Sequence, residues 1–61
     1  MRSNEEITNK IKTIKDRIKV LKTYLLSKYE NEDWHGVEDA GSDIRDEYAR
    51  IAELKWVLSN N

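Results

Sequence analysis

The apolar residues in the first half of the chain recur at alternating intervals of four and three residues. They are Ile7, Ile11, Ile14, Ile18, Leu21 and Leu25. Such a repeat, sustained over about five turns, is typical of an amphipathic helix that packs against another helix. Ser3 followed by Glu6 is the capping-box pattern that marks a helix start, and residues 4–30 contain no Gly or Pro. The sequence therefore predicts one helix over about residues 4–30.

The second half carries a similar repeat, which predicts a second helix over about residues 32–59. Its members are Trp34, Val37, Gly41, Ile44, Tyr48 and Ile51, after which Lys55 interrupts the repeat and Leu58 resumes it. This stripe, including Trp34 and Tyr48, is expected to pack against the first helix. Asn31 is the expected N-cap, with Glu32 and Asp33 in the first turn. The repeat continues across Gly41, so we expect one continuous helix, with any bend at that glycine.

Because only a few residues join the two helices, they are expected to pack as antiparallel neighbours. The fold class is then all-α, an αα-hairpin in which residues 1–61 form a single unit. Two helices cannot cover all their apolar residues, so hairpins are expected to assemble into a four-helix bundle or a higher homo-oligomer, with a dimer favoured. The apolar residues outside the two stripes are Val20, Tyr24, Leu26, Tyr29, Leu54, Trp56 and Val57.

A second face of the later helix is rich in small residues. His35, Ser42, Ala49 and Trp56 recur at intervals of seven, beside Arg45 and Ala52. Small side chains let another helix approach closely. The expected oligomer interface consists of Ser42, Ala49, Ala52, Trp56 and Val57.

Composition and charge narrow the classes of function. At 61 residues without Cys, the chain is too short for an ordinary catalytic domain and has no disulfide to stabilise it. Its 11 basic and 12 acidic residues give a net charge of −1, which offers no global attraction for nucleic acid or an anionic membrane. The basic residues gather in residues 1–30 and the acidic ones in 31–61, so the halves should attract each other. We expect a cytoplasmic protein without membrane contact.

Residue types and their spacing indicate three candidate sites. Glu32 and His35 have the Glu-x-x-His spacing of di-iron bundles, but the matching inward acids are missing, so no metal, no cofactor and no catalytic residue is expected. Arg45 could grip an anion with its planar guanidinium group. The lysines at 3-4-3 spacing could hold RNA, as in the Rop family of hairpin dimers, or pair with acids of the second helix, or stay solvated. These lysines are Lys12, Lys15, Lys19 and Lys22, and Tyr24 is the aromatic residue expected among them.

Parts of residues 31–58 resemble a family of very short helical proteins encoded by phages and prophages. The residues that carry the resemblance are Asp33-Trp34-His35-Gly36-Val37, Asp39-Ala40, Asp43-Ile44-Arg45, Leu54 and Trp56-Val57-Leu58. The resemblance implies an accessory protein in the host cytoplasm that inhibits a host or defence component or sequesters a nucleotide between protomers. For the latter role, the candidate ligand-binding residues are Trp34, His35, Arg45 and Trp56.

These patterns together predict a non-enzymatic helical oligomer that acts as a binding module. Its expected partners are a second copy of itself and a host protein or a small anionic ligand. RNA, held on the lysine stripe of a Rop-like dimer, is the alternative partner.

Overall fold

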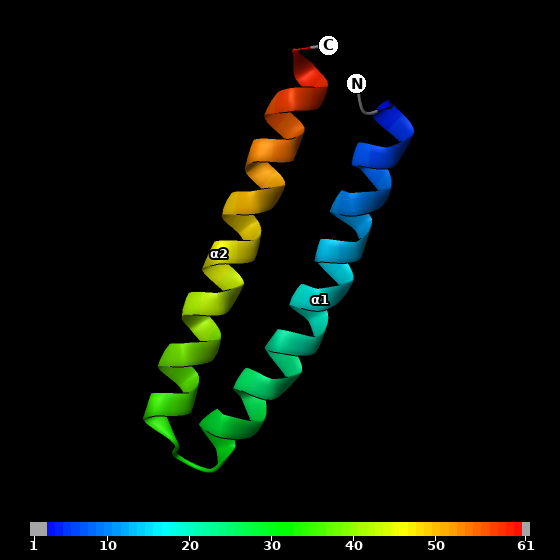
Figure 1. The fold of residues 1–61 in the computed structure, drawn as a ribbon. Helices are drawn as coiled ribbons and strands as arrows, with labels where there is room; N and C mark the ends of the chain where they lie inside the picture. The colour runs from blue at the N-terminus through cyan, green and yellow to red at the C-terminus, as the bar shows by residue number, and fades with distance from the viewer. Residues whose placement is uncertain (1–2, 61) are drawn as a thin grey trace.

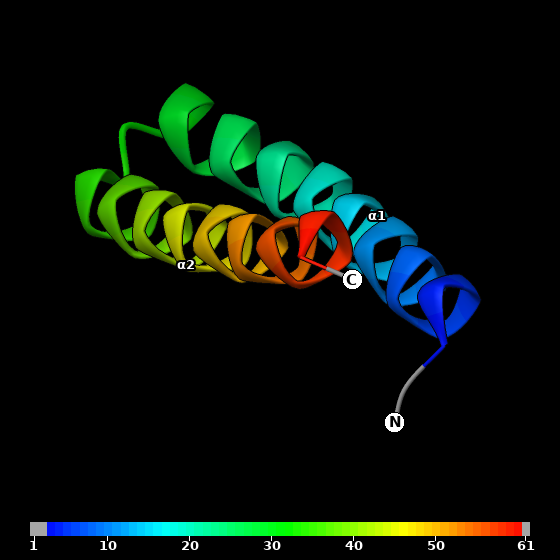
Figure 2. The ribbon, with the colours of Figure 1, turned by 90° about the horizontal axis from the view of Figure 1, so that it is seen from above.

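Two long helices make up nearly all of the protein in the computed structural model, which describes residues 3–60. Helix α1 spans Asn4–Glu30 and helix α2 spans Trp34–Ser59. They run antiparallel, so the start of α1 and the end of α2 lie at the same end of the molecule (Figure 1). Seen from above, the helices lie side by side (Figure 2), within Cα extents of 45 × 14 × 13 Å. The predicted all-α hairpin is confirmed.

Helix α1 begins where the capping pattern places it. The Ser3 side chain accepts a hydrogen bond from the Glu6 backbone N–H at 3.1 Å, which satisfies one of the free N–H groups of the first turn. Glu5 and Glu6 lie in that turn, where carboxylates interact favourably with the helix dipole.

The connection at residues 31–33 differs from the expectation. Asn31 is the C-cap of α1, not the N-cap of α2, and its side-chain amide donates to the Ser27 carbonyl at 2.8 Å. Glu32 has a positive φ of 56°, and its N–H donates to the Tyr29 carbonyl at 3.0 Å. The Asp33 N–H donates to the Lys28 carbonyl at 2.9 Å. This pair of bonds closes a Schellman motif. Because α1 uses residues 31–33 to end, α2 starts two residues later than expected.

Asp33 is the N-cap of α2, so it precedes the first turn in which it was expected. Its Oδ1 accepts from the Gly36 N–H at 3.0 Å, and its Oδ2 lies 3.5 Å from Lys28 Nζ. The hydrogen bond from Gly36, together with the charge of Lys28, holds the pKa of Asp33 below its ordinary value, although desolvation acts in the opposite direction. A single aspartate thus starts α2 and links it back to α1.

The apolar core lies mainly in the half of the hairpin near the chain ends. Four isoleucines of α1 are buried together with Ile51 of α2, and Ile44, Leu54 and Leu58 pack against them; the four are Ile7, Ile11, Ile14 and Ile18. Leu21 and Leu25 continue the α1 stripe toward the loop and are half-buried. The stripe predicted for the first helix is confirmed.

On α2 the buried stripe shares only some residues with the predicted stripe, namely Val37, Ile44, Ile51 and Leu58. Trp34 and Tyr48 were expected in the core, but they are 55% and 48% exposed. Buried or half-buried positions recur at 3-4 spacing as Val37, Ala40, Ile44, Glu47, Ile51, Leu54 and Leu58. The observed stripe contains Ala40, Glu47 and Leu54 in place of Gly41, Tyr48 and Lys55. Because successive residues are about 100° apart around a helix, this change rotates the face of α2 that contacts α1. The rotated stripe avoids burying Lys55 and places Leu54 in the core.

The rotated stripe also places a charged residue between the helices. Glu47 is buried, and its Oε1 lies 3.4 Å from Nη1 of Arg17 on α1. Its Oε2 is buried without a hydrogen-bond partner. Because a buried carboxylate oxygen without a partner is costly, Glu47 weakens the seam in which it lies.

Helix α2 is continuous across Gly41, as expected, and this position gives a direct stability prediction. A Cβ added at Gly41 would meet nothing within 4 Å, whereas one at Gly36 would lie 2.7 Å from Cδ of Lys28. Gly41→Ala is expected to raise the free energy of unfolding by about 1 kcal/mol, because Ala loses less backbone entropy in a helix. Gly36→Ala is the matched control and should gain less, since it displaces Lys28 from Asp33. Urea denaturation followed by circular dichroism measures both, and a larger gain at Gly36 would contradict the prediction.

Candidate functional site

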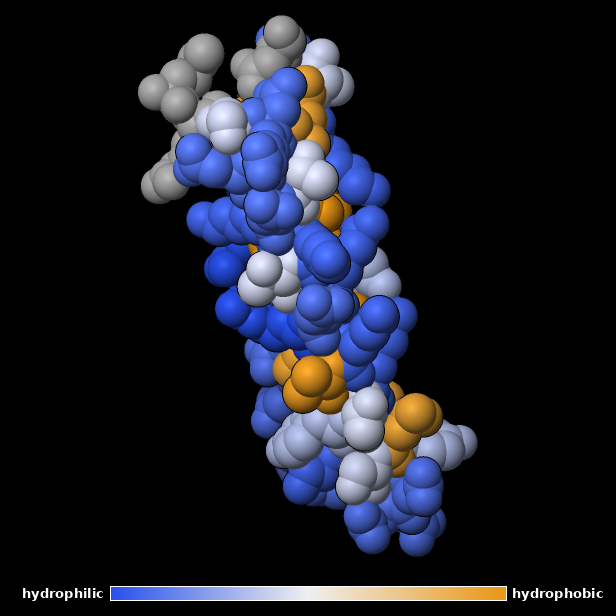
Figure 3. Space-filling model, turned by 90° about the vertical axis from the view of Figure 1, so that its right-hand side faces the viewer, coloured by the Kyte–Doolittle hydropathy of each residue, from blue (hydrophilic) through white to orange (hydrophobic). Residues whose placement is uncertain are grey.

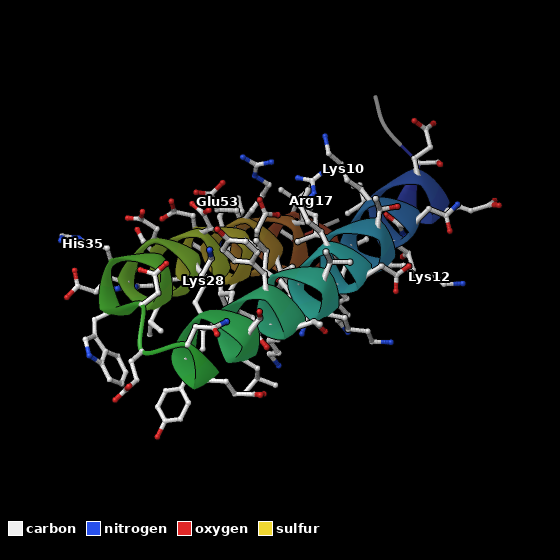
Figure 4. The ribbon with its side chains drawn as sticks, turned by 90° about the horizontal axis from the view of Figure 1, so that it is seen from below. Lys10, Lys12, Arg17, Lys28, His35 and Glu53 are labelled. Carbon is white, nitrogen blue, oxygen red and sulfur yellow. The ribbon has the colours of Figure 1, made fainter. Side chains whose placement is uncertain are left out.

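The four candidate ligand-binding residues are spread along α2. Trp34 and His35 begin the helix at the loop end, where His35 projects outward (Figure 4). Arg45 lies near the middle and Trp56 near the C-terminal end. Trp34 and Trp56 are 22 residues apart, which corresponds to ~33 Å along a helix. A single hairpin therefore does not gather these residues around one small ligand.

The outer face of α2 consists of the small-residue series and its neighbours, namely His35, Ser42, Arg45, Ala49, Ala52 and Trp56. All six are exposed, as is Val57 beside them. They lie on the side of α2 opposite its buried positions, so they point away from α1. The surface predicted as an oligomer interface is thus uncovered in the single hairpin, and its role stays a prediction.

A second set of exposed apolar residues lies toward the other end of the molecule. We call it the loop-end cluster; its members are Leu26, Tyr29 and Trp34. Tyr24 is exposed as well, but it lies two residues before Leu26 and so points to nearly the opposite side of α1. The rings of Tyr29 and Trp34 meet edge to face, with centroids 5.7 Å apart. The side of the molecule that α1 presents is mostly hydrophilic, with apolar patches that include some in the half nearer the loop (Figure 3). The uncovered apolar surface is therefore not centred on Trp56 alone.

A groove lies between the helices on one edge of the hairpin. We call it the lysine groove; it is lined by Lys15, Ile18, Lys19, Lys22 and Tyr48 and encloses about 220 Å³. Four of these residues come from α1, and Tyr48 comes from α2. The Lys22 Nζ lies 5.7 Å from the centroid of the Tyr48 ring, within the range of a cation–π interaction. The groove thus combines an aromatic ring, an apolar floor and three positive charges.

The sequence did not place Tyr48 among the lysines. Tyr24 was the aromatic residue expected there, but its ring lies 5.1 Å from Nζ of Lys28, which does not line the groove. One signal could have identified Tyr48: Lys55 breaks the series that contains Tyr48, whereas Leu54 continues the neighbouring series. The neighbouring series contains a charged residue of its own, Glu47, so this signal is weak. Choosing that series moves Tyr48 from the core to the edge of the seam.

The lysine stripe of α1 and the acidic residues of α2 lie on different edges of the hairpin (Figure 4). Lys12 projects from the side opposite Lys10, Arg17 and Glu53 (Figure 4). Asp39 and Asp46 precede Glu53 at intervals of seven and so share its side of α2. The ion pairs between described residues are Arg17–Glu47 and Lys28–Asp33. The lysine stripe therefore faces solvent instead of pairing with acids of α2.

Comparison with protein-family models, curated proteins and solved structures finds no match to this chain. Within residues 3–60, no group of three His, Cys, Asp or Glu side chains is arranged to hold a metal ion. In the same residues, neither helix is long and apolar enough to cross a membrane.

Proposed function

We propose that this protein is a non-enzymatic binding module that works as a dimer of hairpins. The observation that carries the proposal is the amount of apolar surface that one hairpin leaves uncovered. Eight large hydrophobic side chains are 37–69% exposed, and no large side chain in the described residues is completely buried. Exposed apolar surface on this scale marks an interaction site.

The position of these side chains favours a second copy as the partner. The loop-end cluster lies at one end of the 45 Å hairpin, and Trp56 and Val57 lie near the other. A two-fold axis across the long direction would place the loop of one copy beside the chain ends of its partner. Such an isologous contact is self-complementary and closed. Each Trp56 would then pack beside the loop-end cluster of the other copy.

Two further features support close association of the copies. Ser42, Ala49 and Ala52 on the outer face of α2 have small side chains, which lets a neighbouring helix approach. The net charge is only −1, so two copies repel each other weakly.

The antiparallel dimer would also bring three of the four candidate ligand residues together, while Arg45 stays near the middle of each α2. Trp34 and His35 of one copy would lie near Trp56 of the other, although one chain holds them ~33 Å apart. An anionic ligand or a segment of a host protein could then be bound between protomers. A role of this kind is also the one that a resemblance to phage and prophage accessory proteins would imply.

Sedimentation equilibrium of the purified protein at micromolar concentration tests the proposal. We expect a dimer, and we expect Trp56→Ala to weaken its association by about tenfold or more, since large aromatic side chains dominate interface energies. Val20→Ala and Tyr48→Ala are the controls, because these exposed side chains lie outside the proposed contact with Trp56. They should change the dissociation constant by much less.

Two results would contradict the proposal. One is a folded, helical monomer at these concentrations. The other is a Trp56→Ala variant that associates no more weakly than the two controls.

A further inference from the structure

The ring of Tyr48 offers a stacking surface beside an apolar floor. It is half exposed at the lysine groove, with the buried Ile18 beneath it. The groove volume of about 220 Å³ is below the roughly 300–1,000 Å³ of a pocket that encloses a whole small molecule. Its size and lining suit one flat, partly apolar ring inserted beside Tyr48, with the rest of the ligand outside the groove.

The lysines around this ring continue beyond the groove as a row. Lys12, Lys15, Lys19 and Lys22 follow one another at intervals of three or four residues, which places them on one side of α1 over ~15 Å. None of them takes part in the ion pairs between described residues. Arg45 stands three residues before Tyr48 on α2, a spacing at which helix side chains are neighbours. The positive charges that border the ring are those of Lys15, Lys19 and Lys22 on α1, whereas Arg45 belongs to the outer face of α2 and does not line the groove.

The acidic residues offset this positive edge only in part. Asp16 of α1 lies four residues after Lys12 and three before Lys19, so it is their neighbour on the helix and reduces the four positive charges of the row by one. Glu53 lies on the other side of the hairpin (Figure 4), and Asp39 and Asp46 share its side of α2 because they precede it at intervals of seven. The body between the two sides is 13–14 Å thick. The Debye length at physiological ionic strength is about 8 Å, so these acids of α2 act weakly on a ligand at the lysines. Although the net charge of the protein is near zero, the edge that carries the lysine row is positive and attracts anions.

We propose that the lysine groove binds single-stranded nucleic acid, with one base stacked on Tyr48 and the phosphates along the lysine row. The Lys22 ammonium, which lies 5.7 Å from the centre of the Tyr48 ring in the free protein, then moves from the ring to a phosphate. Base stacking on an exposed aromatic ring beside a positively charged track is the chemistry by which single strands are held. A row of ~15 Å matches about four stacked nucleotides at 3.4 Å each. In a duplex the bases are already stacked and paired, so it could use the lysines but not Tyr48. A mononucleotide would leave most of the row empty.

This inference is independent of the proposed dimer. It depends on the edge formed by Lys15, Lys19 and Tyr48, whereas the dimer depends on Trp56 and the loop-end cluster. Tyr48→Ala should therefore weaken nucleic-acid binding and leave the dimer nearly unchanged in sedimentation. Trp56→Ala should weaken the dimer and leave nucleic-acid binding nearly unchanged.

Fluorescence anisotropy with a short labelled oligouridylate tests the site directly. The wild-type chain should bind it at low salt, more weakly at physiological salt, and more tightly than it binds a labelled duplex of similar length. Tyr48→Ala should weaken binding by about tenfold, the loss expected when one stacked base loses its aromatic platform. Replacing Lys15 and Lys19 together by Gln should also reduce the slope of log affinity against log salt by about 1.4, because two phosphate contacts are removed.

The chain supplies matched controls for both variants. Tyr24 is 50% exposed and has its own lysine, Lys28, over the ring, so Tyr24→Ala removes a similar pair away from the groove. Replacing Lys10 and Arg50 by Gln removes the same charge from other positions. Both controls should keep the affinity and the salt slope nearer to the wild-type values. Circular dichroism of every variant verifies that the hairpin remains helical.

Several outcomes would overturn the inference. The first is no binding of the oligouridylate at low salt. The second is equal affinity for single strand and duplex, or equal losses from Tyr48→Ala and Tyr24→Ala, since each would mean that phosphate contacts alone are made. The third is salt-sensitive self-association that disappears when Lys15 and Lys19 become Gln, because the acidic side of a second copy would then occupy the row.

Discussion

Ile14→Ala is expected to leave the chain largely unfolded at room temperature. Ile14 is only 3% exposed, at the centre of the isoleucine cluster, and truncating such a side chain costs about 2–5 kcal/mol. A single core in a chain of this size rarely supplies more than about 3–5 kcal/mol in total. One substitution therefore removes most of the stability. The measurement is helical content by circular dichroism in dilute solution, where association contributes little, with urea denaturation of any folded fraction.

Leu21→Ala is the matched comparison. Leu21 belongs to the same stripe of α1 but lies toward the loop and is only half-buried. It should cost clearly less than Ile14→Ala, because fewer contacts are lost and water can reach the site. Equal losses would show that the core extends evenly along the hairpin, which is contrary to the burial seen here.

Glu47→Leu is expected to raise the free energy of unfolding by about 2 kcal/mol. A buried ion pair is often no more stabilising than apolar residues of similar volume, because both charges lose hydration. The Glu47 pair is a poor one, since Oε1 stands 3.4 Å from Arg17 and Oε2 has no partner. Leucine at this position would extend the apolar stripe between Ile44 and Ile51, and the half-exposed Arg17 would return to water. Urea denaturation of the variant and the wild type measures the difference.

Arg17→Met tests the same ion pair by removing its cation. It keeps the length of the side chain but leaves the Glu47 carboxylate without its cation, so stability should fall by about 1–2 kcal/mol. Adding Glu47→Leu to Arg17→Met should recover that loss. If Glu47→Leu lowers the free energy of unfolding of the wild-type chain, the Glu47 carboxylate stabilises the hairpin and the prediction is wrong.

Most of the local structure followed from the sequence, because its causes are local. The Ser3 cap, the unbroken stripe of α1 and the absence of Gly and Pro over residues 4–30 fixed the first helix at the bounds that the structure shows. The start of α2 was misplaced because Asn31 is a suitable residue both for ending one helix and for starting the next. Only the paths of the Glu32 and Asp33 N–H groups back to α1 distinguish the two roles.

The candidate site was harder to predict, because it is made of residues from both helices. The lysine stripe is visible in the sequence, yet its aromatic partner lies 26 residues beyond Lys22, on the other helix. No spacing rule within one helix connects Lys22 to Tyr48. The candidate ligand residues of α2 were chosen for their chemistry and from the resemblance to phage proteins, and neither of these shows that a single chain keeps the residues apart along one helix.

The sequence by itself determined that this protein is two amphipathic helices in an antiparallel hairpin, since helix starts, helix periodicity and a short connection are encoded locally. The tertiary structure decided which strip of α2 faces α1. Adjacent residues differ by about 100° around a helix, and two neighbouring strips of α2 both carry apolar residues, so the choice depends on what the partner helix can cover. Packing against α1 buried Ala40 and Glu47 and partly buried Leu54, and it left Tyr48 at the edge of the seam among the lysines.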